Sequence, residues 1–196
     1  MFDKMKDVLI VCALEKETDN QLEGYNVLYT GVGKVNATYE LTRHFITFGF
    51  PQIVVNYGTA GSRNLPIGEL VECNRFVQRD MDVSGLGFPK GQTPFDITPI
   101  LIGNDPLWDS DRNVIVGTGD SFVENVSDEL SIIDVFDMES YALAKVCGKF
   151  NIPFRCWKYI TDNADEKSPK DWEENLSDGI VKFKNEFDEI YNTTSN

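Results

Sequence analysis

The sequence has few of the residues that most catalytic and metal-binding motifs require. It contains one histidine, His44, and four cysteines that form no CxxC pair. A Ser-His-Asp triad needs a histidine that an acid positions, whereas His44 lies in the middle of a helical pattern. The histidine and cysteine spacings of zinc sites are also missing. We therefore expect neither a triad nor a metal site, and we interpret His44 as structural.

Basic residues are scarce relative to acidic ones. The chain has 18 Lys and Arg against 32 Asp and Glu, which gives a formal net charge of −14. A surface with this balance and no basic stripe repels a phosphate backbone, so the composition argues against nucleic-acid binding. It favours an uncharged small-molecule substrate over a phosphorylated one.

Long apolar runs are missing as well. The first run, Val8–Leu14, is much shorter than a membrane span requires. Glu15, Lys16 and Glu17 follow it directly, unlike the cleavage region of a signal peptide. The cysteines lie mainly within apolar segments, which is typical of buried free thiols in a reducing compartment. We expect a cytoplasmic protein with no membrane partner.

The patterns that are present indicate an α/β fold. Apolar, β-rich runs alternate with helical patterns, and several runs lack polar alternation, as in a sheet buried on both faces. The expected strands are Val8–Ala13, Ile53–Tyr57, Leu70–Phe76, Val114–Val116 and Phe154–Ile160. The helical patterns are Ala37–Phe48, Leu143–Phe150 and one long amphipathic stripe from Trp172 to Ile190. No repeat or linker divides the chain, so we expect residues 1–196 to form a single domain.

Three carboxylates lie at or beside the ends of predicted strands. Glu17 follows the first strand, Glu139 begins a helix, and Asp162 ends the strand that includes Ile160. Ligands of α/β folds bind at the carboxyl ends of strands. Cleavage of a glycosidic bond through an oxocarbenium-like transition state needs an acid for the leaving group and a base for water. Alternatively, Glu139 and Asp162 only cap helices and Glu17 is solvated.

Eight short segments occur in the order in which the nucleoside phosphorylase/nucleosidase superfamily carries them. They are Ala13–Glu17, Thr30–Ala37, Asn56–Gly61, Arg79–Val83, Gly91–Gln92, Gly119–Val123, Asp137–Glu139 and Thr161–Asp165. Together they resemble the 5′-methylthioadenosine/S-adenosylhomocysteine nucleosidases. The resemblance implies a three-layer α/β/α fold with a central twisted mixed sheet. It also implies hydrolysis of the N-glycosidic bond of an adenine nucleoside without a cofactor, by a homodimer.

The resemblance also implies roles for individual residues. Glu17 matches the glutamate that activates water, and Asp162 matches the acid that protonates adenine N7. The residues implied to bind substrate are Thr59, Ala60 and Gly61 beside the sugar and water, Met138 and Glu139 at the ribose, Phe122 and Val123 at the purine, and Leu86 and Pro94, which cover the 5′ substituent of the neighbouring subunit.

The sequence departs from this family in a few places. Leu86 replaces a usual aromatic residue, Lys158 a usual arginine and Asp137 a usual glutamate. The chain is also shorter than typical members, between about Pro94 and Val114. These changes concern the pocket for the 5′ substituent, whereas the three carboxylates are present.

Two other functions fit the same sequence. A nucleoside phosphorylase of this fold needs cations to hold phosphate, typically arginine, and Arg63 keeps that alternative open. Glu15 and Glu17 oppose it, because a negative loop repels phosphate. The second alternative is a nucleoside-binding module without catalytic activity, against which the presence of all three carboxylates argues.

Overall fold

The computed structural model describes residues 7–103, 113–126 and 130–192. Its strands are β1 (Val8–Cys12), β2 (Val27–Tyr29), β3 (Ile53–Gly61), β4 (Leu70–Cys73), β5 (Arg75–Gln78), β6 (Leu101–Gly103), β7 (Ile115–Thr118), β8 (Val135–Asp137) and β9 (Phe154–Asp162). Its α-helices are α1 (Lys34–Phe48), α2 (Ser140–Phe150), α3 (Ser168–Asn175) and α4 (Ile180–Asn192), and two short 3₁₀ helices are η1 (Glu15–Glu17) and η2 (Ser84–Leu86). Within these ranges, no helix has both the length and the apolarity needed to cross a membrane.

The strands form one mixed sheet. Its main path runs in the order β2-β1-β3-β8-β7-β5-β6, and β9 pairs with both β3 and β4 outside this path. The pairs β1–β2, β1–β3, β3–β9, β5–β7 and β7–β8 are parallel, whereas β3–β8, β4–β9 and β5–β6 are antiparallel. The long strands β3 and β9 pair from Val54 to Gly61 and are buried along nearly their whole length. The expected mixed sheet is confirmed.

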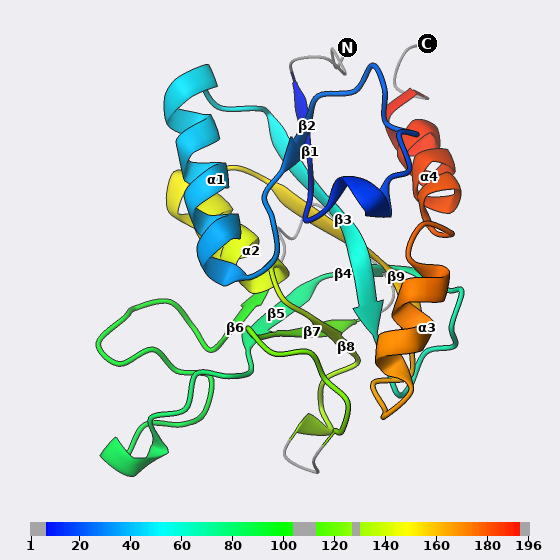
Figure 1. Ribbon diagram of the computed structural model, residues 1–196. Helices are drawn as coiled ribbons and strands as arrows, with labels where there is room; N and C mark the ends of the chain where they lie inside the picture. The colour runs from blue at the N-terminus through cyan, green and yellow to red at the C-terminus, as the bar shows by residue number, and fades with distance from the viewer. Residues whose placement is uncertain (1–6, 104–112, 127–129, 193–196) are drawn as a thin grey trace.

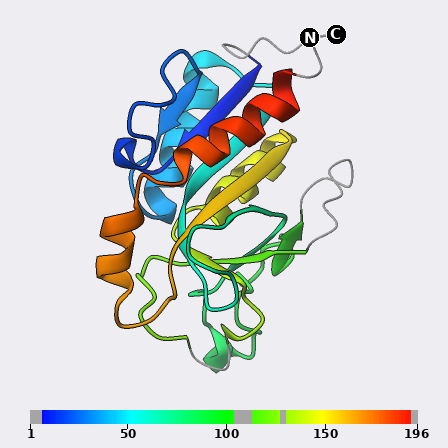
Figure 2. The same cartoon turned by 90° about the vertical axis from the view of Figure 1, so that its right-hand side faces the viewer.

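Helices cover both faces of this sheet. In Figure 1, α1 and α2 lie on the left of the strands and α4 on the right. Figure 2 shows α4 across the near face, with α1 and α2 behind the sheet. Leu41 of α1 and Leu143 of α2 belong to one apolar cluster, and Phe183 and Phe187 of α4 belong to another. These two cores make the expected three layers, because each helix buries one apolar stripe against the sheet.

The long stripe from Trp172 to Ile190 is two helices, so the prediction of one continuous helix was wrong. The stretch ends as α3 at Asn175 and resumes as α4 at Ile180. Gly179, between them, packs against the Tyr159 ring so closely that a Cβ would lie 2.2 Å from the ring's Cγ. The chain therefore turns against β9 here. This turn sends α3 toward the end of the sheet.

The run Leu70–Phe76 is also not a single strand. β4 pairs with β9, whereas β5 pairs with β6 and β7. Asn74 separates them: the Val114 N–H donates to its Oδ1 at 3.1 Å, and its own N–H donates to the Val114 carbonyl. An asparagine side chain that bonds backbone in this way competes with a continuous ladder. The chain changes partners there.

Candidate active site

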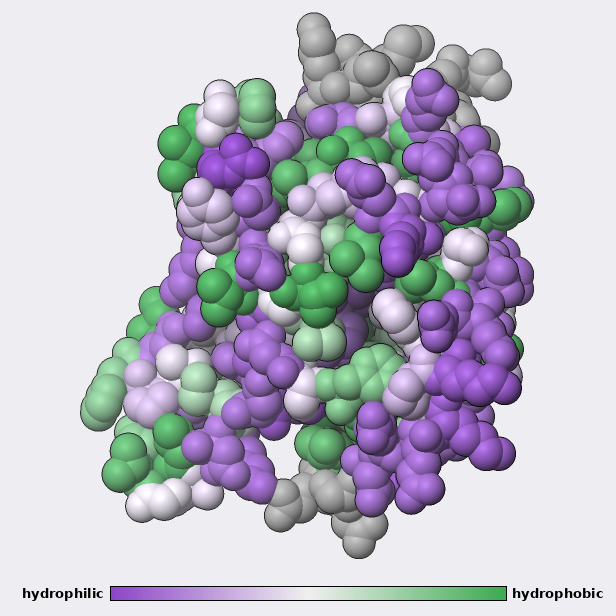
Figure 3. All heavy atoms as spheres, viewed as in Figure 1, coloured by the Kyte–Doolittle hydropathy of each residue, from purple (hydrophilic) through white to green (hydrophobic). Residues whose placement is uncertain are grey.

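One cavity of about 600 Å³ lies where several strands end. Its lining comes from the segments after β1 and β7 and from the ends of β3, β8 and β9, and α3 closes one side. The lining residues are Ala13, Leu14, Glu17, Val32, Thr59, Ala60, Gly61, Arg79, Ser121, Phe122, Val123, Glu124, Phe136, Asp137, Met138, Glu139, Asp162, Pro169, Trp172 and Glu173. In Figure 3, apolar residues gather in the centre of this face, with hydrophilic ones over α3 and α4 beside them.

Glu17 is buried at the wall of this cavity and is not a solvated residue. Its Oε1 accepts the backbone N–H of Thr59 at 2.8 Å and the Thr59 hydroxyl at 2.9 Å. Its Oε2 accepts the backbone N–H of Leu14 at 2.9 Å. Three donors point at this one carboxylate, so both of its oxygens act as hydrogen-bond acceptors. The side chain is therefore set as an acceptor.

Asp162 ends β9 inside the cavity. Its Oδ2 accepts the Thr161 hydroxyl at 3.0 Å, and its Oδ1 accepts the Ala164 N–H at 3.0 Å. The opposing strand must carry glycine here, since a Cβ on Gly61 would lie 2.5 Å from Asp162 Oδ1. Asp162 begins a tight turn and faces the cavity at the same time, so a capping role and a functional role do not exclude each other.

Glu139 is the N-cap residue of α2, but its side chain does not cap that helix. Its Oε1 instead accepts the backbone N–H of Gly33, at the start of α1, at 2.7 Å. Burial raises the pKa of Glu139 to about 8, and the negative charge of Asp137 acts in the same direction. A carboxyl group with this pKa is mostly protonated at neutral pH.

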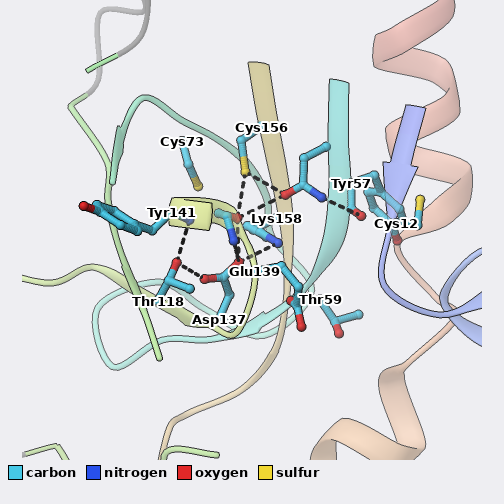
Figure 4. A network of polar contacts seen from close by, with 12 residues as sticks. Cys12, Tyr57, Thr59, Cys73, Thr118, Asp137, Glu139, Tyr141, Cys156 and Lys158 are labelled. Carbon is cyan, nitrogen blue, oxygen red and sulfur yellow. Dashed lines mark hydrogen bonds and ion pairs between the residues drawn. The ribbon is translucent and has the colours of Figure 1, made fainter. Parts of the chain in front are cut away.

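Asp137, which lines the cavity, forms a buried ion pair with Lys158 (Figure 4). Lys158 Nζ lies 2.9 Å from Asp137 Oδ2, and each side chain is 1% exposed. Burial alone would raise the pKa of Asp137, but the Lys158 ammonium and the hydroxyls of Ser140 and Thr118 hold it below its ordinary value. In turn, Asp137 raises the pKa of Lys158 although burial opposes this. Both groups stay charged.

The ammonium of Lys158 also lies close to Glu17. A Cβ on Gly58 would be 3.0 Å from Lys158 Nζ and 3.5 Å from Glu17 Oε1. Both groups therefore approach the backbone of β3 at a residue that has no side chain. Lys158 therefore places a positive charge behind the carboxylates of the cavity. Such a charge lowers the cost of holding several acids together.

Comparison with known proteins shows the family of this chain. The Phosphorylase superfamily model matches residues 21–191. A 5′-methylthioadenosine/S-adenosylhomocysteine nucleosidase of Marinomonas sp. is 32% identical over 179 residues, which cover 80% of this chain and 76% of the relative. This chain belongs to the 5′-methylthioadenosine/S-adenosylhomocysteine nucleosidase family of the phosphorylase superfamily.

Solved structures of this superfamily have the same fold. The nucleosidase of Helicobacter pylori with butyl-thio-DADMe-Immucillin-A superimposes with a TM-score of 0.80 at 27% identity, over 91% of this chain and 94% of that one. A futalosine hydrolase of Helicobacter pylori gives a TM-score of 0.77 at 25% identity, over 90% and 93% of the two chains. The nucleosidase fold expected from the resemblance is confirmed.

The structure brings most of the predicted site residues together. Glu17, Thr59, Ala60, Gly61, Phe122, Val123, Met138, Glu139 and Asp162 all line the cavity. Leu86 and Pro94 do not, and Leu86 is 76% exposed on η2. This position agrees with a contact to another subunit, which stays a prediction. Part of the shortened segment, residues 104–112, lies outside the described residues.

Arg63 also lies outside the cavity lining, although the phosphorylase alternative depended on it. It is exposed, and its Nη1 donates to the Val126 carbonyl at 3.0 Å. The arginine that does line the cavity is Arg79, whose guanidinium donates to the Gly119 carbonyl and to the hydroxyl and carbonyl of Ser121. These bonds hold Arg79 against the loop that precedes Phe122.

Among the lining residues to which the sequence assigned no role, Trp172 and Arg79 make side-chain hydrogen bonds at the site. Trp172 was only part of an apolar stripe, yet it lines the cavity and its indole N–H donates to the Thr59 hydroxyl at 3.0 Å. Arg79 belongs to the matching segment Arg79–Val83, but the resemblance assigned it no role. Neither residue has a spacing that points to the cavity, because both reach it only through the packing of loops and α3. Among the residues that the structure describes, no group of three or more potential ligands is arranged to hold a metal ion.

Proposed function

We propose that this protein hydrolyses the N-glycosidic bond of an adenine nucleoside of the methylthioadenosine or S-adenosylhomocysteine type. The products are adenine and the free sugar. The observation that carries the proposal is that Glu17, Glu139 and Asp162, from three separate strand ends, line one cavity of about 600 Å³. That volume suits a nucleoside-sized ligand. The names of the relatives support the same substrate class.

Glu17 is proposed as the base that activates water. Water is a poor nucleophile, so a positioned base has to take its proton as the sugar cation forms. Three donors fix the Glu17 carboxylate at the cavity wall, where it can face a water beside the sugar. The oxygen of the water then bonds to the anomeric carbon, and its proton moves to the carboxylate.

Asp162 is proposed as the acid that protonates adenine N7. The electrons of the breaking bond move into the purine, and a proton at N7 makes adenine a neutral leaving group. Asp162 has donors on both oxygens from its own turn, which fixes its orientation toward the cavity. At the purine, Phe122 offers an apolar ring that is 44% exposed, and Val123 offers its backbone.

Glu139 and Met138 are proposed to hold the ribose. A sugar hydroxyl that donates to Glu139 favours the charged carboxylate, whereas burial favours the protonated form. Thr59, Ala60 and Gly61 complete the wall on the side of the water. The sugar is thus held between the end of β3 and the start of α2.

Adenine release decides between this function and its alternatives. We expect the wild-type protein to liberate adenine from methylthioadenosine at the same rate in phosphate-free buffer and in millimolar phosphate, with no sugar phosphate formed. A rate that rises and saturates with phosphate would favour the phosphorylase. No adenine release from any of methylthioadenosine, S-adenosylhomocysteine and adenosine would favour a binding module. Glu17→Gln should be nearly inactive, because its amide cannot take the proton.

A homodimer is part of the proposal. Exposed apolar side chains cover the outer side of α1 and the segment around η2: Val35, Tyr39, Ile46, Leu86, Phe95 and Ile97. Figure 3 shows hydrophobic residues along the left edge of the molecule over these elements. Exposed groups of large apolar side chains are typical of subunit interfaces. This exposed group supports a second copy that brings Leu86 and Pro94 over the partner's cavity.

Sedimentation tests the dimer. Ile46→Glu, at 76% exposure on α1, should yield monomers and reduce activity, whereas Val181→Glu, at 55% exposure on α4, should leave the dimer intact. A fully active wild-type monomer would contradict this part of the proposal.

A further inference from the structure

Trp172 has no role in the mechanism above, yet it forms a hydrogen bond with Thr59, a residue of the site. Its indole Nε1 lies 3.0 Å from the Thr59 hydroxyl oxygen. That oxygen lies 2.9 Å from Glu17 Oε1. The three side chains, from α3, β3 and η1, thus form a chain of hydrogen bonds that ends at the proposed base.

The direction of each proton in this chain follows from the donors and acceptors. An indole N–H can only donate, and a hydroxyl has one proton. Thr59 therefore accepts from Trp172 and must donate its own proton to Glu17. Since the Thr59 backbone N–H also donates to Oε1, at 2.8 Å, that oxygen holds two donors. Oε2 holds one, from Leu14.

We propose that Trp172 is a positioning residue for the water-activating step. It fixes the direction of the Thr59 hydroxyl, which saturates Oε1 of Glu17 and leaves Oε2 as the oxygen that takes the proton from water. Without the indole N–H, the hydroxyl can turn and donate elsewhere, so both oxygens of Glu17 compete for the water. The inference rests on the proposed function, because it assigns a task within the same site.

The anchoring of α3 supports this role. Asn175, at the end of α3, donates from Nδ2 to the Thr161 carbonyl at 3.0 Å. At the other end, the Ser168 hydroxyl accepts the Asp165 backbone N–H at 2.8 Å. Both anchors belong to the segment that carries Asp162. The helix that positions the base is therefore tied to the strand end that holds the proposed acid.

Steady-state kinetics of Trp172→Phe test the proposal, because phenylalanine keeps a ring at the cavity wall and removes only the N–H donor. We expect kcat to fall about fivefold, the effect of one neutral hydrogen bond, with KM within about twofold. Trp157→Phe is the matched control, since Trp157 lies in the apolar core on the side of α4 and should keep the wild-type kcat.

The dependence on Thr59 separates positioning from general packing. In a Thr59→Val background, Trp172→Phe should cause no further loss of kcat, because the hydroxyl that it orients is gone. In a Thr59→Ser background, it should cause the same loss as in the wild type. An equal loss in the valine background would overturn the inference. So would full activity of the single variant Trp172→Phe, provided that the wild-type protein releases adenine.

A spectroscopic measurement tests the contact without turnover. The chain has three tryptophans, and Trp172→Phe assigns the Trp172 indole N–H signal in a ¹H–¹⁵N spectrum. Thr59→Val should move this signal and speed its hydrogen exchange, whereas the Trp157 signal should stay in place. An unchanged Trp172 signal would overturn the inference. Absence of adenine release by the wild type would instead overturn the proposed function, and the indole signal would still decide whether Trp172 orients Thr59.

Discussion

Replacing Glu139 by glutamine should stabilise the protein at high pH while it impairs catalysis. Glutamine at this position has the shape of the protonated carboxyl group, and its oxygen can still accept the Gly33 N–H that Glu139 accepts at 2.7 Å. It differs in that it never ionises. The neutral form is the one that the buried site favours, because Asp137 and Glu17 add negative charge there and Lys158 only partly offsets it.

The magnitude follows from the pKa. Glu139 has a pKa of about 8 in the folded protein against an ordinary value of 4.5. Because the folded-state pKa is raised, its stabilising contribution is fully present below pH 4.5 and is lost as the pH rises through 8. Between pH 6 and pH 9, the wild type should lose about 1–3 kcal/mol of unfolding free energy through this group, and Glu139→Gln should not.

Urea unfolding of both proteins at pH 6 and pH 9 measures this difference. The gap between Glu139→Gln and the wild type should widen by about 1–3 kcal/mol toward pH 9, or by roughly 2–4 °C in Tm for each kcal/mol. Glu173→Gln, which removes a charge from an exposed position at the same cavity, is the control and should leave the gap constant. A gap of equal size at both pH values for Glu139→Gln would refute the reasoning.

Three further predictions concern the carboxylates. Asp162→Asn should lower kcat about 10²–10⁴-fold and leave the affinity for a non-hydrolysable analogue nearly unchanged, as calorimetry can measure; near-normal turnover would remove it from the mechanism. Lys158→Met leaves Asp137 buried without its partner and should cost about 3–5 kcal/mol of unfolding free energy, part of which Asp137→Asn in the same chain should restore. Nucleoside binding at pH 7 should release protons, because sugar hydroxyls favour ionised Glu139. Calorimetry in buffers of different ionisation enthalpy measures this release. A heat of binding that is the same in all buffers would contradict the prediction.

Long apolar elements could be predicted from the sequence. The runs that became β1, β3 and β9 lack polar alternation, and strands buried on both faces require such runs. The short strands β2, β6 and β8 were missed, because three residues carry no period. Gly179 turns the chain between α3 and α4 only because it packs on Tyr159, a contact that helical periodicity does not include.

The candidate carboxylates could also be found in advance, since strand ends and matching segments mark Glu17, Glu139 and Asp162. The pKa of Glu139 and the hydrogen-bond donors to Glu17 could not be predicted from the sequence. The raised pKa of Glu139 depends on burial beside Asp137. The donors on Glu17 come from Leu14 and from the distant β3.

The sequence by itself determined the fold class and the family and marked the three candidate carboxylates, because apolar runs and short ordered segments are local properties of the chain. Only the tertiary structure decided that Lys158 supplies the charge behind them, that Arg63 lies outside the cavity and that Trp172 reaches Thr59. Hydrogen bonds and charge interactions act over a few ångströms, and such distances between remote residues exist only after the chain has folded.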